Sequence, residues 1–312
     1  MSAQFTSALA ASAEAASGQH YPQSTLYVVA TPIGNLADIS LRALHVLGLC
    51  DAIACEDTRH TQALLRAYGI DKNSSHLIAV HQHNEAQAAH TVIDHLRQGQ
   101  RVAYVSDAGT PGISDPGARL VAAVHAQGLR ALPLPGPSSV TTLLSVAGIA
   151  EDNAHSGGFV FIGFLPTKSG ERDKAVQVLA TQERATVILE APHRIEALAR
   201  ALAVLGPRKV TVGRELTKQF EEIATVTAEG LTAWLDADAN RLRGEFALVL
   251  HPAPRAEQSG PDTRILKLLL EQLPLKTAVK LAADITGEPR NILYELALAV
   301  KGAGADSGAV SS

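Results

Sequence analysis

The stretch TLYVVATPIGNLADISLRALHVLGLCDAIACEDT (residues 25–58) holds two short apolar runs separated by a Pro/Gly turn and an amphipathic segment. Runs of this length, rich in β-branched residues and joined by a helical pattern, are typical of a βαβ unit. We therefore predict strands over 25–30 and 52–55 with a helix over 41–49 between them. The same alternation continues to residue 127, which predicts a mostly parallel sheet covered on both faces by helices.

The pattern changes after residue 148, where strands follow one another with less helix between them. A second, mixed sheet is predicted from apolar runs at 159–162, 186–190, 210–213, 223–227 and 245–250, with helices at 173–181 and from Pro192 to 205. Near the chain end, amphipathic runs at 276–285 and 289–299 flank Thr286-Gly287, a spacing typical of a helix-turn-helix.

The predicted fold class is therefore α/β, with two α/β domains and a small C-terminal helical extension. The expected parts are a disordered tail (1–24), an N-terminal α/β domain with the ligand loops (25–150), a second α/β domain (158–251), a linker (252–261), the helix-turn-helix-like extension (262–301) and a second tail (302–312).

Composition excludes several classes of protein. The chain has 27 Lys and Arg against 31 Asp and Glu, a formal charge of -4, which argues against a protein that coats nucleic acid nonspecifically. Yet 19 of the 27 basic residues follow residue 165, so a polyanion contact is expected in that half. Cys50 and Cys55 are too few for a disulfide scaffold or a zinc cluster and indicate a reducing cytoplasm. No apolar run reaches the ~18 residues that a membrane span needs, so no membrane role is expected.

Unusual segments follow the first, second, fourth and fifth predicted strands, and the one after the fourth (106–117) holds three Gly and two Pro in twelve residues. In open α/β sheets ligands bind beyond the carboxyl ends of the strands, and glycines let the backbone approach them closely. The loops lack both G-x-G-x-x-G after the first strand and a P-loop Lys, so a dinucleotide or a triphosphate is disfavoured. Loops rich in backbone carbonyls suit a cationic nucleoside, and S-adenosylmethionine meets that description.

These loops also carry a family resemblance. The motifs TPIGNLADIS, EDTRHT, VSDAGTPGISDPG, PGPSS, GFLP, LEAPHRI and GREL–K–FEEI together resemble the ribosomal RNA small-subunit methyltransferase I family, a branch of the tetrapyrrole methylase superfamily. The resemblance implies S-adenosylmethionine-dependent methylation of the 2′-hydroxyl of one cytidine in 16S rRNA, at the decoding centre of the small ribosomal subunit. It also implies a cofactor cleft between the two α/β domains, and a homodimer.

Carried over position by position, the resemblance implies cofactor contacts made mostly by backbone atoms. The implied positions are Pro32, Ser106, Asp107, Ala108, Gly109, Thr110, Ser138, Ser139, Phe164, Leu165, Pro166, Ala191 and Pro192. The alternative for each position is an ordinary turn residue.

Methyl transfer to a hydroxyl is helped by a base near the oxygen. Acidic side chains follow several strands, and we predict Asp57, with Glu56 beside it, as the catalytic carboxylates. Arg59 would hold an RNA phosphate. The alternative is that Asp57 only pairs with Arg59 or caps the helix that begins near Thr58.

Basic residues cluster in the later motifs and are predicted to face the RNA backbone, where phosphate contacts set affinity and orientation. They are Lys168, Arg172, His193, Arg194, Arg214 and Lys218. No metal is predicted, because His81-Gln82-His83 with Glu85 is accompanied by no further clear ligands. Two rival functions stay open: a methyltransferase acting on a tetrapyrrole, and a non-catalytic RNA-binding module.

Overall fold

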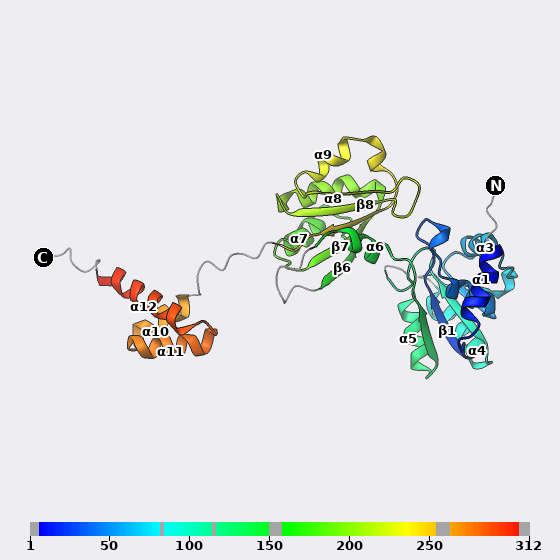
Figure 1. The fold of residues 1–312 in the computed structure, drawn as a ribbon, viewed down its shortest axis with the longest axis horizontal. Helices are drawn as coiled ribbons and strands as arrows, with labels where there is room; N and C mark the ends of the chain where they lie inside the picture. The colour runs from blue at the N-terminus through cyan, green and yellow to red at the C-terminus, as the bar shows by residue number, and fades with distance from the viewer. Residues whose placement is uncertain (1–5, 82–83, 114–116, 150–157, 254–262, 306–312) are drawn as a thin grey trace. The chain divides into compact units, whose positions relative to one another are not determined.

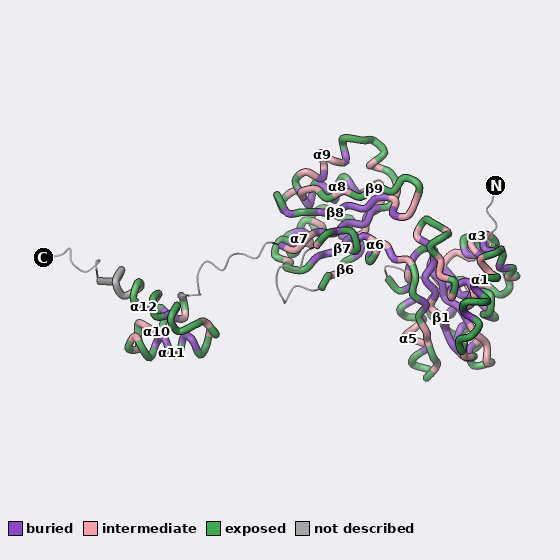
Figure 2. The backbone as a smooth tube through the Cα atoms, viewed as in Figure 1, coloured by how far each residue is buried: buried purple, intermediate pink, exposed green. Residues whose placement is uncertain are grey.

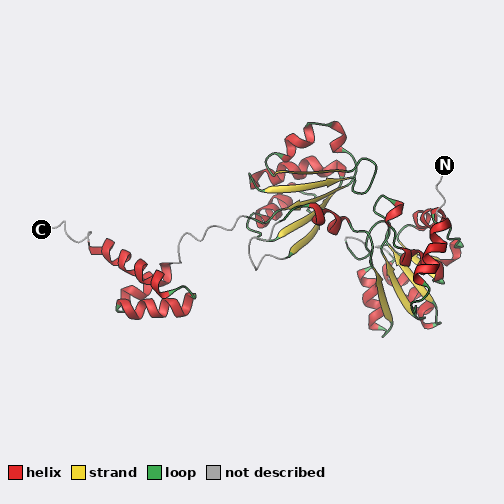
Figure 3. Cartoon of the chain, viewed as in Figure 1, coloured by secondary structure: helices red, strands yellow, loops and turns green. Residues whose placement is uncertain are grey.

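The computed structural model describes residues 6–81, 84–113, 117–149, 158–253 and 263–305, and the side chains among them up to residue 300. The chain divides into two compact units, residues 1–253 and 254–312 (Figure 1). The first unit contains both sheets and the second is helical (Figure 3).

The first sheet is wholly parallel, with strand order β3-β2-β4-β1-β5. Its core lies on both faces, so the central strands β1, β2 and β4 are almost wholly buried, as their continuous apolar runs predicted, whereas the edge strands β3 and β5 are partly exposed (Figure 2). The strands are β1 (Thr25–Val29), β2 (Ala52–Cys55), β3 (Leu77–Ala79), β4 (Arg101–Val105) and β5 (Arg130–Leu134), and the helices that cover them are α2 (Leu41–Leu49), α3 (Thr58–Ala67), α4 (Glu85–Arg97) and α5 (Ala118–Ala126).

The second sheet is mixed, which confirms the prediction. Its strand order is β6-β7-β10-β8-β9, with β6 parallel to β7 and the other neighbours antiparallel. The strands are β6 (Phe159–Phe164), β7 (Ala185–Glu190), β8 (Lys209–Arg214), β9 (Glu222–Thr227) and β10 (Phe246–Leu250), and α7 (Ser169–Leu179), α8 (Ile195–Leu202) and α9 (Leu231–Asp236) share one core with them. The helix predicted from Pro192 to 205 is α8 flanked by 3₁₀ turns, Pro192–Arg194 and Ala203–Leu205.

Helix α6 (Ser139–Val146) follows a strand of the first sheet but packs on the second. Val140 and Leu143 are buried against Val187 of β7 and Val249 of β10. The predicted boundary at residue 150, which assigns this segment to the N-terminal domain, is therefore wrong in packing terms. The reason is that α6 carries apolar residues which the sequence alone assigns to neither sheet.

The prediction of a disordered tail over 1–24 is wrong for the residues that are described. Helix α1 (Thr6–Ala16) packs against α2, and Ser12 and Ala16 are buried. Leu9 and Tyr21 also contact the core of the first sheet. An Ala-rich segment is a good helix former, and its few apolar side chains suffice to dock it.

The C-terminal unit consists of α10 (Thr263–Gln272), α11 (Leu275–Thr286) and α12 (Arg290–Ala305). Leu266, Val279, Ala282 and Leu293 form its own small core. Gly287 lies between α11 and α12 with φ +75°, a left-handed conformation that glycine adopts at helix ends without strain. The helix-turn-helix is confirmed, but α12 extends into the predicted tail as far as Ala305; most of the predicted linker lies outside the described residues.

Both cysteines are buried, and burial raises the pKa of Cys50 to about 12 and that of Cys55 to about 11. Because the thiolate is the reactive form, neither side chain is a nucleophile at neutral pH. We expect negligible reaction with a thiol reagent at pH 8 in the native protein and complete reaction in denaturant, measured by release of a coloured thiolate. Reaction of the native protein as fast as a free thiol would contradict the burial.

Candidate active site

The loops after β1 and β4 are joined directly at the carboxyl edge of the first sheet. Thr31 N donates to Gly109 O at 2.9 Å, and Gly109 N donates back to Thr31 O at 3.0 Å. The Thr31 hydroxyl donates to Ser106 O at 3.2 Å. Gly109 has φ +82°, which favours a residue without Cβ. Strands β1 and β4 are neighbours in the sheet, and this adjacency brings the two loops together.

The loop after β5 completes this edge. The Thr110 hydroxyl donates to Pro137 O at 3.0 Å, which ties the fourth loop to the fifth. Ser138 then occupies the N-cap position of α6 without a side-chain capping hydrogen bond, and it is buried. Gly136 lies so close to β1 that an added Cβ would be 2.9 Å from the Ala30 Cβ. Small residues in PGPSS therefore permit the close packing of these loops.

Two cavities adjoin at this edge and share several lining residues, Phe164 and Leu189 among them. The smaller, about 210 Å³, is lined by Ala108, Gly109, Thr110, Ser138 and Ser139. The larger, about 360 Å³, is lined mainly by apolar side chains of the second sheet and by Ala191 and Pro192. A polar, backbone-rich hollow beside an apolar one fits a ligand with a charged end and a flat aromatic end.

Several predicted cofactor residues do not line these cavities: Pro32, Ser106, Asp107, Leu165 and Pro166. Pro32 and Ser106 are buried behind the loops, and Ser106 Oγ donates to Ala108 O at 3.3 Å, so Ser106 shapes the loop from within. Leu165 points into the core around α7 and α8. Sequence reasoning missed other lining residues, namely Ile33, Ile113, Val140, Leu189, Glu190, Leu216, Glu245, Phe246 and Ala247.

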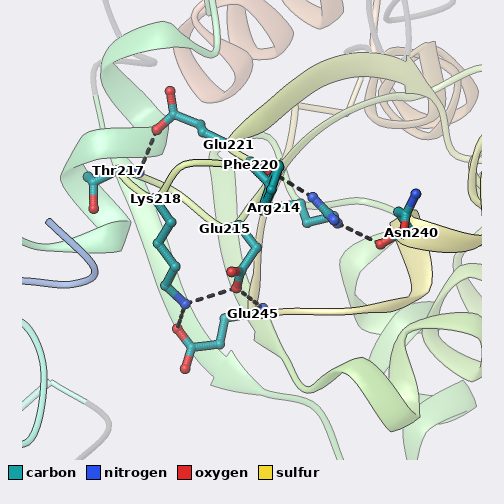
Figure 4. Close-up of polar contacts among 8 residues, drawn as sticks. All are labelled: Arg214, Glu215, Thr217, Lys218, Phe220, Glu221, Asn240 and Glu245. Atoms are coloured by element: carbon teal, nitrogen blue, oxygen red, sulfur yellow. Dashed lines mark hydrogen bonds and ion pairs between the residues drawn. The ribbon is translucent and has the colours of Figure 1, made fainter. Parts of the chain in front are cut away.

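A network of charges borders the cavities at the loop after β8 (Figure 4). Lys218 Nζ lies 2.8 Å from Glu215 Oε1 and 3.0 Å from Glu245 Oε2. Burial lowers the pKa of Lys218, but the hydrogen bonds to both carboxylates outweigh it and the pKa is raised. Glu215 and Thr217 have φ of +51° and +67°, a costly conformation for residues with Cβ.

This network corrects two predicted RNA contacts. Arg214 is 7% exposed and donates from Nε to Asn240 O at 3.0 Å and from Nη1 to Phe220 O at 2.8 Å. Its guanidinium therefore holds the loop together, and its prediction as a phosphate ligand is wrong. Lys218 is paired with two carboxylates, Glu215 and Glu245, so its ammonium group also stabilises the loop and is not free to bind an RNA phosphate.

The remaining predicted RNA contacts fall into two groups. The side chain of Arg194 is 17% exposed, and its Nε lies 3.0 Å from Glu190 Oε1. Arg194 also donates to Leu165 O, so it stabilises the turn formed by the LEAPHRI motif. Lys168 is exposed and pairs with Glu171, and Arg172 donates to Thr167 O at 3.2 Å. Lys168, Arg172 and the exposed His193 stay candidates for RNA contact.

Asp57 fulfils the alternative role that the sequence left open. It is the N-cap of α3, with Oδ1 accepting from Arg59 N at 2.8 Å, and its Oδ2 lies 3.0 Å from Arg59 Nη2. The hydrogen bond from the Arg59 side chain is the main cause that lowers the pKa of Asp57 to about 2. Asp57 N also donates to Asp107 Oδ1 at 3.2 Å, which links the second loop to the fourth. Glu56 is partly buried beside this pair.

Within the part of the chain that the structure describes, no group of three or more His, Cys, Asp or Glu side chains could hold a metal ion. Gln82 and His83 lie outside the described residues. Glu85 is buried, with its Oε2 3.5 Å from Arg119 Nη1. No helix of the described chain is long and apolar enough to cross a membrane.

Comparison with known families decides what kind of protein carries this site. The family model for tetrapyrrole (corrin/porphyrin) methylases matches residues 25–232, which hold the whole first sheet and all strands of the second except β10. The chain belongs to this family. A second model, for the C-terminal helix-turn-helix domain of ribosomal RNA small subunit methyltransferase I, matches residues 256–301.

Within the methylases, several similar curated proteins carry the name ribosomal RNA small subunit methyltransferase I. The protein of that name from Escherichia coli O157:H7 is 45% identical over 90% of this chain and 96% of its own length. The one from Neisseria meningitidis serogroup A is 47% identical over 89% of this chain and 94% of its own. The one from Pseudomonas aeruginosa is 44% identical over 89% and 98%. These identities place the chain in that branch of the family.

Solved structures of distant methylases share the fold. A cobalamin biosynthetic enzyme, cobalt precorrin-4 methyltransferase, superposes with a TM-score of 0.53 at 16% identity and covers 72% of this chain and 94% of its own. The methyltransferase CobJ superposes with a TM-score of 0.52 at 18% identity, covering 73% and 94%. At this distance the likeness shows the fold alone.

The methyl donor of this methylase is S-adenosylmethionine, and the residues present fit it. Ala108 and Gly109 line the smaller cavity, where their carbonyl dipoles would stabilise a sulfonium. Phe164, Leu189 and Leu216 line the larger cavity and would offer apolar surface to an adenine ring. The bound cofactor supplies a methyl group on positively charged sulfur.

Proposed function

We propose that this protein transfers the methyl group of S-adenosylmethionine to the 2′-hydroxyl of one cytidine in 16S rRNA, at the decoding centre of the small ribosomal subunit in the cytoplasm. The observation that carries the proposal is identity of 42–47% to proteins named ribosomal RNA small subunit methyltransferase I, over 86–90% of this chain. The supporting geometry is the polar and apolar cavity pair at the joined loops.

The reaction is an in-line displacement, in which the hydroxyl oxygen approaches the methyl carbon opposite the sulfur. Positioning then accounts for much of the rate. The hydrogen bonds between Thr31 and Gly109 and between Thr110 and Pro137 fix the loops that would hold the donor. Arg59 pairs with Asp57, yet its side chain is 90% exposed, so it can hold a phosphate of the acceptor RNA while Asp57 orients it.

A carboxylate with a pKa of about 2 accepts a proton weakly, so we assign Asp57 to positioning. We expect Asp57→Asn to keep turnover within about threefold of wild type, because Asn caps a helix as well as Asp does. Loss of a true general base would instead cost ~10²–10⁴-fold. Single-turnover methyl transfer measures this, and a loss of a hundredfold or more with unchanged cofactor binding would restore Asp57 as the base.

The control is Asp57→Ala, which removes the cap and is expected to lower the melting temperature where Asn does not.

The lowered pKa of Asp57 makes stability depend on pH in a definite direction. The contribution of Asp57 to stability is complete above about pH 4 and is lost as the pH falls towards 2.

The test of the function itself is transfer of tritiated methyl from S-adenosylmethionine to three acceptors: purified small ribosomal subunits, naked 16S rRNA and a tetrapyrrole. We expect label in the subunit, located at a cytidine 2′-oxygen by nuclease digestion and mass spectrometry. Label in the tetrapyrrole alone would overturn the proposal in favour of a small-molecule methylase, and no label in any acceptor would favour a non-catalytic RNA-binding protein. The homodimer stays a prediction, to be checked by sedimentation.

A further inference from the structure

The C-terminal unit has a groove of its own. A cavity of about 580 Å³ lies between α11 and α12 and is lined by Lys276, Val279, Lys280, Arg290, Asn291, Tyr294 and Glu295. All of these side chains except Val279 are exposed. The groove is therefore a polar surface feature, and the core of the unit lies elsewhere, around Leu266, Ala282 and Leu293.

Charge is unevenly distributed over this unit. Lys276 and Lys280 are four residues apart on α11, which places them on one face of the helix. Arg290 begins α12 and brings a third cation to the same groove. Glu295 is the single acid among the lining residues, so the groove carries an excess of positive charge.

The acids of the unit lie largely outside the groove. Glu271, Asp284 and Glu288 do not line it, and Asp284 Oδ1 pairs with Arg290 Nη2 at 3.0 Å. Over the described side chains the unit holds nearly equal numbers of basic and acidic residues. The positive charge of the groove thus arises from where the basic residues lie on α11 and α12 and not from the net charge of the unit. A count of charged residues in the sequence therefore does not detect it.

We propose that the groove between α11 and α12 binds the sugar-phosphate backbone of the RNA substrate. Lysine ammonium groups contact phosphates as point charges, which sets affinity and orientation without reading sequence. Asn291 offers an amide to sugar hydroxyls, and the Tyr294 ring, 39% exposed, offers a face on which a base can stack. The groove would hold the RNA while the α/β unit transfers the methyl group; that it holds ribosomal RNA rests on the proposed function.

The test compares two double variants of the full chain that lose equal charge. Lys276→Ala with Lys280→Ala empties the groove of its α11 cations, whereas Lys209→Ala with Lys267→Ala removes two exposed lysines outside it. Affinity is measured for purified small ribosomal subunits and for a labelled single-stranded fragment of 16S rRNA over a range of salt concentrations. S-adenosylmethionine affinity is measured in parallel.

We expect the groove variant to bind RNA about tenfold more weakly at low salt, with a salt slope reduced by about 1.4, since each lost single-strand phosphate contact contributes ~0.7. The control variant should match wild type, and cofactor affinity should be unchanged in both. Equal weakening in both variants would overturn the proposal, because it would indicate diffuse charge. A normal salt slope with an altered sedimentation coefficient would also overturn it, in favour of a second copy in the groove.

The two proposals fail separately. If wild type methylates no ribosomal acceptor but the groove variant still loses RNA affinity, the proposed function is wrong and the proposal that the groove binds RNA holds. If wild type methylates the subunit and the groove variant binds and methylates like wild type, only the proposal for the groove is wrong.

Discussion

Replacing Gly109 with alanine is expected to weaken S-adenosylmethionine binding about 10- to 100-fold while the protein remains folded. Gly109 has φ +82°, and an added Cβ would lie 3.3 Å from Ile33 Cγ2 at the wall of the smaller cavity. The left-handed conformation costs an alanine ~1–2 kcal/mol. The loop can relieve this strain only by moving the backbone that joins it to Thr31, and each 1.4 kcal/mol lost from binding is tenfold in affinity. Isothermal titration with S-adenosylhomocysteine measures the effect.

The matched control is Gly99→Ala. Gly99 also has φ +82°, and nothing lies within 4 Å of an added Cβ there, so the backbone strain is the same without any change at the cavity. We expect both variants to lose similar stability and only the Gly109 variant to lose cofactor affinity. Unchanged affinity in Gly109→Ala would mean that the cofactor does not contact this loop.

Replacing Arg208 with methionine is expected to lower the free energy of unfolding of the second α/β domain by about 3 kcal/mol. Arg208 is 7% exposed and donates to the backbone oxygens of His251, Leu179 and Gln182. Burial lowers the pKa of Arg208 to about 10, so the guanidinium is charged at neutral pH. Methionine fills the space but removes three hydrogen bonds from a charged donor, each worth ~1.5–3 kcal/mol before relaxation and water entry. Leu179 O and Gln182 O keep backbone donors in Gln182 N and Ala253 N, which limits the loss.

Urea unfolding followed by tryptophan fluorescence reports this domain selectively, because the single tryptophan, Trp234, packs against its core. The control is Lys209→Met, the exposed next residue and the first of β8, with an expected change within about 0.5 kcal/mol. A loss of less than 1 kcal/mol in Arg208→Met would contradict the structural role assigned to its hydrogen bonds.

The sequence predicted the elements well because their signals are local. The helix at Leu41–Leu49 has the predicted bounds, since it is amphipathic and begins directly after Ser40, its N-cap. Docking is not local. Whether α1 packs on α2, and to which sheet α6 belongs, depends on apolar faces that meet only in the folded chain.

The site shows the same division. Ala108, Gly109 and Ser138, which are predicted to contact the cofactor, line the smaller cavity, because parallel strands bring their following loops to one edge. Their contact with the cofactor stays a prediction. Arg214 and Arg194 were predicted to face RNA, since a basic residue in a motif gives no sign of whether its partner is a phosphate or a carbonyl of its own chain. Phe246 and Ala247 were missed because a cavity residue at a strand end reads as core in sequence.

The packing of α6 has a practical consequence for dissecting the molecule. A fragment cut in the segment 150–157, where the sequence places the domain boundary, would carry α6 away from its sheet and leave Val140 and Leu143 uncovered. Its counterpart would start at β6 with Val187 and Val249 uncovered. Both halves would then present apolar surface and aggregate. A division before α6, in the turn at Pro135–Pro137, keeps the helix with its sheet. A fragment that carries the second sheet should therefore begin about fifteen residues before the boundary predicted at residue 150.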